Sequence, residues 1–331
     1  MTEQSPGGIL ATVGGTPLVS LAGLVPGHTG RVFAKLEWFN PGGSIKDRTA
    51  SEMLATRIRS GRLDPARATV VESSSGNLGV GLAQFCRYHG MRFICVVDAR
   101  TAKRNIALIK AYGATVEVVE APDPETGDFL TARLRRVREI VAADPDAYWP
   151  NQYGNLLNPR AHLRTMREIA EALDHDVDYL FSAVSTFGTL RGCANYIRNT
   201  GMATKVVAVD AAGSVILGHP SGRRLLPGHG AGVRSALVDL SLADEAVRIT
   251  DMEAVLACRR TVMHSGIMAG ASSGAVVAAF ERLSAKLPAD ATSVLIFPDS
   301  GERYLDTVYS DTWVQDNLGP LPVPAPQIEQ G

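Results

Sequence analysis

The chain has 331 residues, of which 45% are hydrophobic and 20% are charged, and its formal net charge at pH 7 is −1. This length allows a large hydrophobic core and favours two domains over one. The near-neutral charge gives no electrostatic reason to expect nucleic acid or an anionic membrane as a partner. The sequence contains no run of about 18 apolar residues, which is the length needed to span a bilayer.

Strand-like and helical segments alternate along the chain. Short apolar, β-branched segments predict strands at 32–37, 69–72, 93–97, 115–119, 179–183, 206–209 and 293–297. Amphipathic segments predict helices at 47–59, 77–89, 103–112, 129–142, 160–173, 190–199, 252–264 and 274–287. Almost wholly apolar strands separated by helices are typical of α/β folds, in which parallel sheets carry helices on both faces. Ligand sites are then expected where strands end and the next helices begin.

Two further features indicate the compartment. The first 15 residues have no basic start and no apolar run, so we expect no signal peptide. The four cysteines show neither CxxC pairing nor metal-ligand spacing, and we expect reduced, mostly buried thiols in a cytoplasmic protein. These cysteines are Cys86, Cys95, Cys193 and Cys258.

Lys46 follows two glycines and a serine in segment 40–48 (NPGGSIKDR), at the start of a predicted helix. Glycines allow the backbone to approach a ligand closely, and a helix N-terminus favours a neighbouring anion. A lysine amine becomes nucleophilic when desolvation lowers its pKa, and it can then form a Schiff base with an aldehyde. An isolated loop lysine is usually a solvated surface residue, so its role depends on motifs farther along the chain.

Two later turns between a predicted strand and a predicted helix are rich in hydroxyl groups. Segment 72–79 (ESSSGNLG) offers hydroxyls, backbone N–H groups and an amide, which suit a carboxylate or phosphate ligand. Segment 185–189 (STFGT) suits a phosphate monoester, bound by hydrogen bonds and the helix dipole. Either turn could instead be an ordinary helix cap, so neither identifies a site by itself.

A third hydroxyl-rich turn, segment 270–274 (GASSG), also begins a helix and is followed by segment 298–305 (PDSGERYL). The chain contains neither GxxxxGK[ST] nor GxGxxG, so it lacks the usual cradles for nucleoside triphosphates and dinucleotides. Its seven histidines form no HExxH motif, and no carboxylate cluster has metal-ligand spacing. The basic segment 133–138 (RLRRVR) is typical of a solvated helix face.

Taken in order, these segments resemble the pyridoxal-phosphate enzymes of the tryptophan-synthase-β type (fold type II), specifically the cysteine synthase and cystathionine β-synthase branch. Segments 14–18, 40–48, 75–77, 185–189, 272–274 and 299–305 carry the resemblance, which spans roughly residues 9–312. It implies two domains, each an open twisted, mostly parallel sheet flanked by helices, with the cofactor in the cleft between them. The smaller, mobile domain would be 49–149, the larger would be 9–48 plus 150–315, and the Pro-rich tail at 316–331 would be disordered.

The resemblance also implies residue roles. Lys46 would hold pyridoxal 5′-phosphate as an internal aldimine, Asn77 would hydrogen-bond its ring hydroxyl oxygen, and Ser272 would face its pyridine nitrogen. A hydroxyl partner leaves that nitrogen largely unprotonated, which disfavours transamination and suits β-elimination. The turn that binds the cofactor's phosphate would comprise Ser185, Thr186, Phe187, Gly188 and Thr189. The amino-acid substrate would be surrounded by Ser74, Ser75, Gly76, Asn77, Leu78, Gln152 and Tyr153.

Four positions depart from the cysteine synthase pattern. Ser185 and Phe187 replace glycines of a Gly-Thr-Gly-Gly-Thr turn. Leu78 replaces a threonine, and Tyr153 stands where phenylalanine is common. These changes indicate a reshaped acceptor pocket, and segment 72–79 is most similar to the 2,3-diaminopropionate-pathway synthases of siderophore and peptide-antibiotic biosynthesis. Those enzymes join O-phospho-L-serine to L-glutamate and give N-(1-amino-1-carboxy-2-ethyl)-L-glutamate.

The reaction that this resemblance implies is a β-replacement. Lys46 would take the Cα proton of phosphoserine as a general base, and phosphate would leave from Cβ. The remaining α-aminoacrylate would be attacked by the neutral amine of the second amino acid. Because this electrophile is long-lived, water must be excluded while the acceptor enters. The resemblance further implies closure of the smaller domain through residues 74–78, and a homodimer.

Two arginines are candidates for binding the anionic substrates. A phosphate group carries about two negative charges at neutral pH and glutamate adds two carboxylates, so charge-assisted contacts are expected. Arg234 lies in segment 230–235 (GAGVRS), which borders the active site in the related enzymes. Arg133 would reach the cleft if its basic helix faces it. Either side chain could instead be exposed, without a role in binding.

Other functions remain open. A cysteine synthase would use O-acetylserine or O-phosphoserine with sulfide, and a serine or threonine dehydratase would release a keto acid without an acceptor. A non-catalytic member of the family would have lost the lysine, whereas Lys46 is present. A dinucleotide-binding oxidoreductase would need the glycine-rich fingerprint that the chain lacks.

Overall fold

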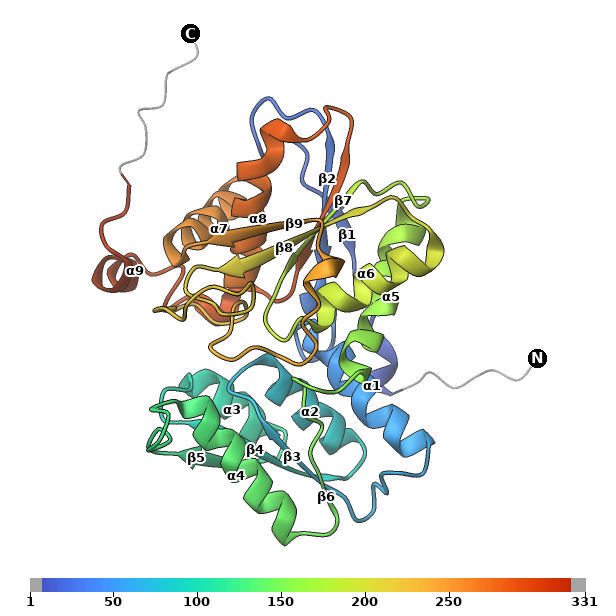
Figure 1. Ribbon diagram of the computed structural model, residues 1–331, viewed down its shortest axis with the longest axis vertical. Coiled ribbons are helices and arrows are strands. Elements are labelled where there is room, and N and C mark those ends of the chain that lie inside the picture. Colours follow the sequence, from blue (N-terminus) through green and yellow to red (C-terminus); the bar gives the residue numbers. More distant parts are fainter. Residues whose placement is uncertain (1–7, 323–331) are drawn as a thin grey trace, which may run out of the picture.

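A computed structural model describes residues 8–322 of the chain and shows two lobes, each built on its own sheet (Figure 1). The larger lobe has a six-stranded sheet in the order β1-β2-β10-β7-β8-β9, and the smaller lobe has a four-stranded sheet in the order β5-β4-β3-β6. Strand β1 pairs with β2 antiparallel, and the other pairs among the described strands are parallel. The predicted α/β class with mostly parallel sheets is confirmed.

All seven predicted strands are present. The strands of the larger lobe are β1 (Leu18–Ser20), β2 (Arg31–Leu36), β7 (Tyr179–Ala183), β8 (Lys205–Ala211), β9 (Glu245–Ile249) and β10 (Thr292–Phe297). Those of the smaller lobe are β3 (Thr69–Ser73), β4 (Arg92–Asp98), β5 (Thr115–Val119) and β6 (Ala147–Tyr148). Strands β1, β6 and β9 were not predicted, because β1 and β6 are very short and most of β9 is exposed, so none shows a continuous apolar run.

The eight predicted helices are also present. The helices are α1 (Lys46–Arg59), α2 (Asn77–Tyr88), α3 (Lys103–Ala111), α4 (Phe129–Ala143), α5 (Leu157–Ala172), α6 (Gly188–Thr200), α7 (Asp251–Ser265), α8 (Ala271–Leu283) and α9 (Asp311–Leu318). Helix α5 begins three residues earlier than expected because Pro159 lies in its first turn, where a missing N–H is tolerated. No helix within residues 8–322 is long and apolar enough to cross a membrane.

Helix α9 corrects one expectation about the C-terminal tail. The sequence predicts a disordered tail from residue 316 onward, but residues 316–318 form the last turn of α9. Ser310 caps this helix by accepting a hydrogen bond from the backbone N–H of Trp313 at 3.3 Å, and Val314 is buried. The prediction for residues 323–331 lies outside the described residues. The four cysteines are free and buried, as predicted.

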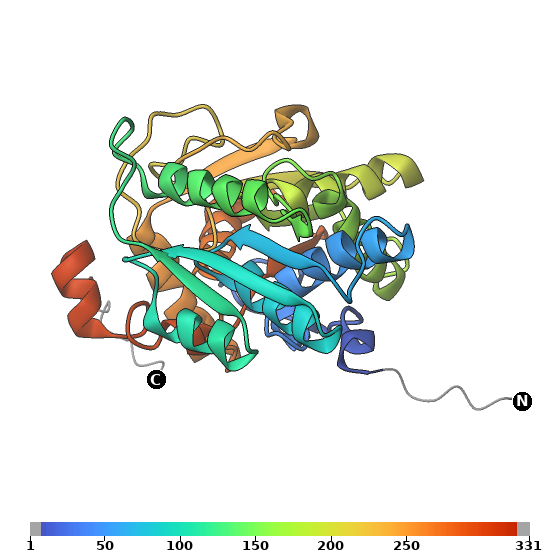
Figure 2. The same cartoon turned by 90° about the horizontal axis from the view of Figure 1, so that it is seen from below.

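Helices cover both faces of each sheet. In the larger lobe α7 and α8 lie on one face and α5 and α6 on the other (Figure 1). In the smaller lobe α2 and α3 pack on one face and α4 on the other (Figure 2). Helix α1 packs against α2 and also against α5. The predicted domain boundary at residue 49 therefore falls inside a helix that contacts both lobes.

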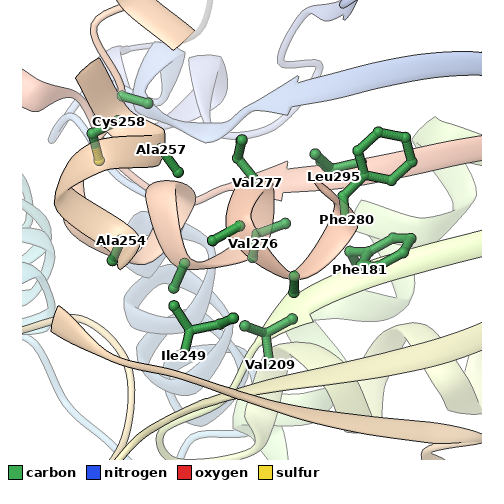
Figure 3. Close-up of a cluster of buried hydrophobic side chains, with 14 of the residues drawn as sticks. Phe181, Val209, Ile249, Ala254, Ala257, Cys258, Val276, Val277, Phe280 and Leu295 are labelled. Carbon is green, nitrogen blue, oxygen red and sulfur yellow. The ribbon is translucent and has the colours of Figure 1, made fainter. Parts of the chain in front are cut away.

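Helix α8 is buried along nearly its whole length and anchors the larger lobe. A Cβ added at Gly274 would lie 2.2 Å from the carbonyl oxygen of Ala254, so glycine is needed for the close packing of α8 against α7. The first turn of α8, which contains Ser272, is therefore held by a rigid core. Figure 3 shows that core, with Val276, Val277 and Phe280 of α8 beside Phe181, Val209, Ile249 and Leu295 of the sheet.

A buried ion network fixes α1. The Arg48 guanidinium lies 2.6 Å from Glu37 and 2.6 Å from Glu168, and Lys35 lies 2.9 Å from the same Glu168 carboxylate. Burial acts to raise the pKa of Glu168, but its hydrogen bonds and the Arg48 charge outweigh burial and hold that pKa well below its usual range. Because these residues belong to β2, the short turn directly after it, α1 and α5, the network sets where α1 begins, and Lys46 is its first residue.

Candidate active site

A cleft of about 880 Å³ lies between the lobes, at the turns that follow the parallel strands. It brings together the hydroxyl-rich turns singled out in the sequence and the start of α1. Fifteen of the sixteen predicted site residues line it: Lys46, Ser74, Ser75, Gly76, Asn77, Leu78, Arg133, Gln152, Tyr153, Ser185, Thr186, Phe187, Gly188, Thr189 and Ser272. The sixteenth, Arg234, is exposed and does not line the cleft.

The loop before Lys46 is shaped by its glycines and by the chain after β10. Gly43 has a φ of +81°, a conformation that favours glycine. The backbone N–H of Gly42 donates to the Asp47 carboxylate at 2.6 Å, and that of Ile45 donates to the Pro298 carbonyl at 2.9 Å. Lys46 is thus held at the start of α1 by hydrogen bonds on both sides of the loop.

The surroundings of Lys46 favour its neutral form. Burial lowers the pKa of Lys46 to about 8, although the nearby Asp299 carboxylate acts in the opposite direction. Asp299 is itself buried, and desolvation raises its pKa while hydrogen bonds from Tyr304 and Asn77 oppose the rise. A lysine whose pKa lies near neutral pH has enough free amine to attack an aldehyde or to move a proton.

Asn77 is the first residue of α2 and is held from the larger lobe. Its Nδ2 donates to Asp299 Oδ2 at 2.7 Å, and its Oδ1 accepts a hydrogen bond from Arg303. Arg303 also donates to the Gly42 carbonyl at 2.7 Å. In the same turn, Ser74 Oγ accepts from the Gly79 N–H at 3.0 Å. The motif that contains Arg303 was noted in the sequence, but this contact was not predicted.

The turn at 185–189 forms the N-terminus of α6. Thr186 Oγ1 accepts a hydrogen bond from Asn158 Nδ2 at 3.1 Å, and a Cβ added at Gly188 would lie 2.1 Å from Asn158 Oδ1. Phe187 has a φ of +71°, which explains why a glycine is usual at its position. Its side chain is 2% exposed and packs in the core of the larger lobe. The turn presents hydroxyls and a helix N-terminus to the cleft, which suits a phosphate group.

A histidine that was not predicted from the sequence supports the Thr189 end of this turn. His162 Nε2 lies 3.4 Å from Thr189 Oγ1 and 3.1 Å from Thr49 Oγ1. Burial and the charges of Lys46 and Arg48 hold the pKa of His162 well below its usual range, so the ring is neutral at neutral pH. A neutral imidazole can accept a hydrogen bond from a hydroxyl. Because His162 belongs to α5, Thr49 to α1 and Thr189 to α6, these contacts join the three helices.

Ser272 presents a buried hydroxyl without a partner. The residue is 1% exposed, it lines the cleft, and its Oγ forms no hydrogen bond with any described residue. A Cβ added at Gly228 would lie 3.3 Å from this oxygen, so the backbone opposite is close. A buried polar group in a native protein normally has a partner. The hydroxyl therefore fits a ligand atom such as the pyridine nitrogen of pyridoxal phosphate.

The cleft is strongly cationic. Arg133 lies 3.3 Å from the Asp98 carboxylate (Nε to Oδ2), and Arg100 stacks over Phe129 with its guanidinium carbon 4.2 Å from the ring centre. Arg100, Lys103 and Arg104 were not predicted, although they follow β4 at its carboxyl end, where the expected location of ligand sites could have identified them. Among the described residues that line the cleft one is acidic, Asp306, and six are basic: Lys46, Arg100, Lys103, Arg104, Arg133 and Arg303.

Known proteins show sequences and folds similar to this chain. Residues 9–299 match the family described as pyridoxal-phosphate dependent enzyme. The chain is 44% identical over 307 residues to N-(2-amino-2-carboxyethyl)-L-glutamate synthase of Ralstonia nicotianae, which covers 92% of this chain and 90% of that protein. It superposes on the cysteine synthase of Entamoeba histolytica with a TM-score of 0.86 and 33% identity, over 93% and 92% of the two chains. It superposes on the O-acetylserine dependent cystathionine β-synthase of Helicobacter pylori with a TM-score of 0.85 and 26% identity, over 91% and 98%.

Proposed function

Because the chain belongs to the family of pyridoxal-phosphate dependent enzymes, we propose that it joins O-phospho-L-serine to L-glutamate by β-replacement. The products would be phosphate and N-(1-amino-1-carboxy-2-ethyl)-L-glutamate. The observation that carries the proposal is the charge of the cleft, whose described lining residues include six basic side chains and one acidic one. Such a cleft attracts a phosphate and several carboxylates, and the 44% identical relative is named N-(2-amino-2-carboxyethyl)-L-glutamate synthase.

The residues of the cleft fit pyridoxal phosphate. It would be held by Lys46, by Asn77, by the turn at 185–189 and by Ser272. When bound, the cofactor withdraws electrons from the substrate's Cα and makes the proton on that carbon acidic. A hydroxyl at Ser272, in place of a carboxylate, favours loss of a group from Cβ over transamination. The unpartnered Oγ of Ser272 supports this assignment.

Lys46 would move the proton at the substrate's Cα. Its pKa of about 8 places the amine near the pH at which it can take up and return a proton with similar ease. Arg133, Arg100 and Arg104 line the same cleft and would bind the anionic groups of the two substrates. Binding at several cationic side chains would orient both substrates before reaction.

We also propose that residues 49–149 form a mobile domain that excludes water when the cleft closes. Hydrogen bonds already join the lobes across the cleft: Asn77 donates to Asp299, and Arg104 donates to the Glu302 carbonyl. Opening would break these contacts, and closure would restore them. The family resemblance further supports a cytoplasmic homodimer. Its reaction would be the first step toward L-2,3-diaminopropionate, a building block of a siderophore or peptide antibiotic.

Mass spectrometry of the products tests this proposal. The holoenzyme would be incubated with O-phosphoserine or O-acetylserine, each with glutamate or with sulfide, and Lys46→Ala would serve as the inactive control. We expect the glutamate adduct from phosphoserine. A cysteine synthase, which the 33% identity to the Entamoeba histolytica cysteine synthase favours as the second candidate, would give cysteine instead. A keto acid formed without any acceptor would indicate a dehydratase, and either result would overturn the proposal.

A further inference from the structure

The side-chain amide of Asn77 lies between two charged groups that come from one segment of the larger lobe. Its Nδ2 donates to Asp299 Oδ2 at 2.7 Å, and its Oδ1 accepts from the Arg303 guanidinium. Both partners are anchored elsewhere. Tyr304 donates its hydroxyl to Asp299 Oδ2 at 2.6 Å, and Arg303 donates to the Gly42 carbonyl at 2.7 Å. The amide is therefore held at both ends by groups that are themselves fixed.

These partners permit one orientation of the amide. A guanidinium can only donate hydrogen bonds, so it must face the amide oxygen. Asp299 Oδ2 already accepts from Tyr304 and Asn77, so it stays an acceptor and must face the amide nitrogen. Turning the Asn77 amide by half a turn would place oxygen against carboxylate and N–H against guanidinium. Both contacts would then be repulsive.

We propose that Asp299 and Arg303 are positioning residues, which fix Asn77 so that it presents an N–H, and not a carbonyl oxygen, to the ring oxygen of the cofactor. An amide nitrogen carries two hydrogens, and Asp299 takes one of them. The second remains for a ligand, and Asn77 lines the cleft. An N–H donor favours the ionised form of a ring hydroxyl. This inference does not depend on which substrates the enzyme uses.

Arg303 also ties this donor to the loop that carries Lys46. The Gly42 carbonyl that it contacts lies four residues before Lys46. In pyridoxal phosphate the aldehyde and the hydroxyl are on neighbouring ring carbons. One guanidinium therefore sets the relative positions of the two side chains that must reach those neighbouring groups, although they belong to different helices, α1 and α2.

Substitution of Arg303, in the wild type and in an Asn77→Ala background, tests the inference. Arg303→Met removes the donor, Arg303→Lys keeps a group that only donates, and each would be combined with Asn77→Ala. Two quantities would be measured: the dissociation constant of pyridoxal phosphate from the protein, and the share of bound cofactor whose ring hydroxyl is ionised, from absorption spectra. Asp299→Asn is less suitable because it would also change the charge beside Lys46.

We expect Arg303→Met to weaken cofactor binding about tenfold and to shift the bound cofactor toward the neutral hydroxyl. Arg303→Lys should restore most of both. In the Asn77→Ala background, Arg303→Met should leave the ionised share of the cofactor unchanged and should weaken cofactor binding less than it does in the wild type, because only the contact with the Gly42 carbonyl remains to be lost. A purely structural role would give equal losses in both backgrounds, and that result would overturn the proposal. The proposal would also be overturned if Arg303→Met had the same cofactor dissociation constant and the same absorption spectrum as the wild type.

Arg282→Met is a matched control, because Arg282 also donates to a backbone carbonyl, that of Arg248 at 2.8 Å, and to a side chain, Glu253. It lies outside the cleft lining and should leave both quantities unchanged. Thermal unfolding of the cofactor-free variants reports whether each one folds. If Arg303→Met does not fold, Arg303→Gln carries the same test. A glutamine amide can donate or accept, so it no longer forces the orientation of Asn77.

Discussion

Trp149 donates its indole N–H to the Glu72 carboxylate across 2.9 Å (Nε1 to Oε1), and thereby joins the chain after β6 to the end of β3. Glu72 is 1% exposed, and it also accepts from the backbone N–H groups of Ser73 at 2.9 Å and Gln152 at 3.3 Å. Gln152 lines the cleft, whereas Glu72 does not. A buried carboxylate behind the site thus holds part of its wall.

This carboxylate predicts a pH-dependent stability. Burial raises the pKa of Glu72 from 4.5 to about 7, although the Trp149 and backbone donors oppose the rise. The folded state therefore binds a proton at Glu72 more tightly than the unfolded state does. This difference stabilises the folded state fully below about pH 4.5, and the contribution is lost as the pH rises through about 7. Between about pH 5 and about pH 8 the unfolding free energy of the wild type should fall because of Glu72. In Glu72→Gln this fall should be smaller by up to about 3 kcal/mol.

Urea unfolding at several pH values measures this effect as the difference between variant and wild type. The comparison removes the contribution of Asp47, whose pKa burial also raises to about 7. Equal pH slopes for the two proteins would mean that Glu72 is ionised in the folded state throughout this range.

Lys46 should be the residue that binds the cofactor covalently. Borohydride reduction followed by peptide mapping should place the label on Lys46, and Lys46→Ala should abolish product formation while phosphate contacts still bind free cofactor weakly. Because burial lowers the pKa of Lys46 to about 8, the rate at which cofactor-free protein captures pyridoxal phosphate should rise as the pH increases through about 8. A label on another lysine, such as Lys103 of the same cleft, would contradict the assignment.

Ser272→Asp should slow the reaction while the cofactor still binds. A carboxylate facing the pyridine nitrogen would stabilise the protonated form of that nitrogen, which strengthens electron withdrawal and permits stray transamination. Stopped-flow absorption after addition of phosphoserine would follow the change, and Ser272→Ala is the control for loss of the hydroxyl without a new charge. If Ser272→Asp leaves both rate and spectrum as in the wild type, another group occupies the nitrogen.

Arg133 and Arg234 should behave differently in kinetics. Arg133 lines the cleft, whereas the side chain of Arg234 is exposed outside it. Arg133→Gln should raise the KM for phosphoserine or for glutamate at least about tenfold, since a lost charge-assisted contact costs about 1.5–3 kcal/mol. Arg234→Gln should leave both constants within about twofold. Unchanged constants in Arg133→Gln would place anion binding on the backbone amides, hydroxyls and other basic side chains.

The family, the fold class and the strands and helices that position the site were predictable from sequence because the signals are local. Lys46, Asn77 and Ser272 each lie at the start of a helix, and the parallel sheets bring such turns to one cleft. The family match confirms the resemblance that these motifs indicated. The roles of individual residues stay predictions.

Arginine contacts were not predictable in the same way. Arg234 belongs to an irregular segment between β8 and β9, where no periodicity indicates which way a side chain points. Arg303 finds its partners, Asn77 and Gly42, more than two hundred residues away, and nothing in the local sequence marks them. Phe187 was a recognised departure from glycine, but only the fold shows that its buried ring compensates for a left-handed backbone.

The pairing of β2 with β10 has a consequence for the order of assembly during synthesis. Arg31 and Thr292 are paired although they are 261 residues apart, whereas the four strands of the smaller lobe lie within residues 69–148. Long loops close slowly and at a larger entropic cost, so the smaller sheet can form on the ribosome first. In the loop before Lys46, the backbone N–H of Ile45 donates a hydrogen bond to the carbonyl of Pro298, which directly follows β10. The nascent chain therefore cannot complete its reactive lysine loop until nearly all of it has been translated.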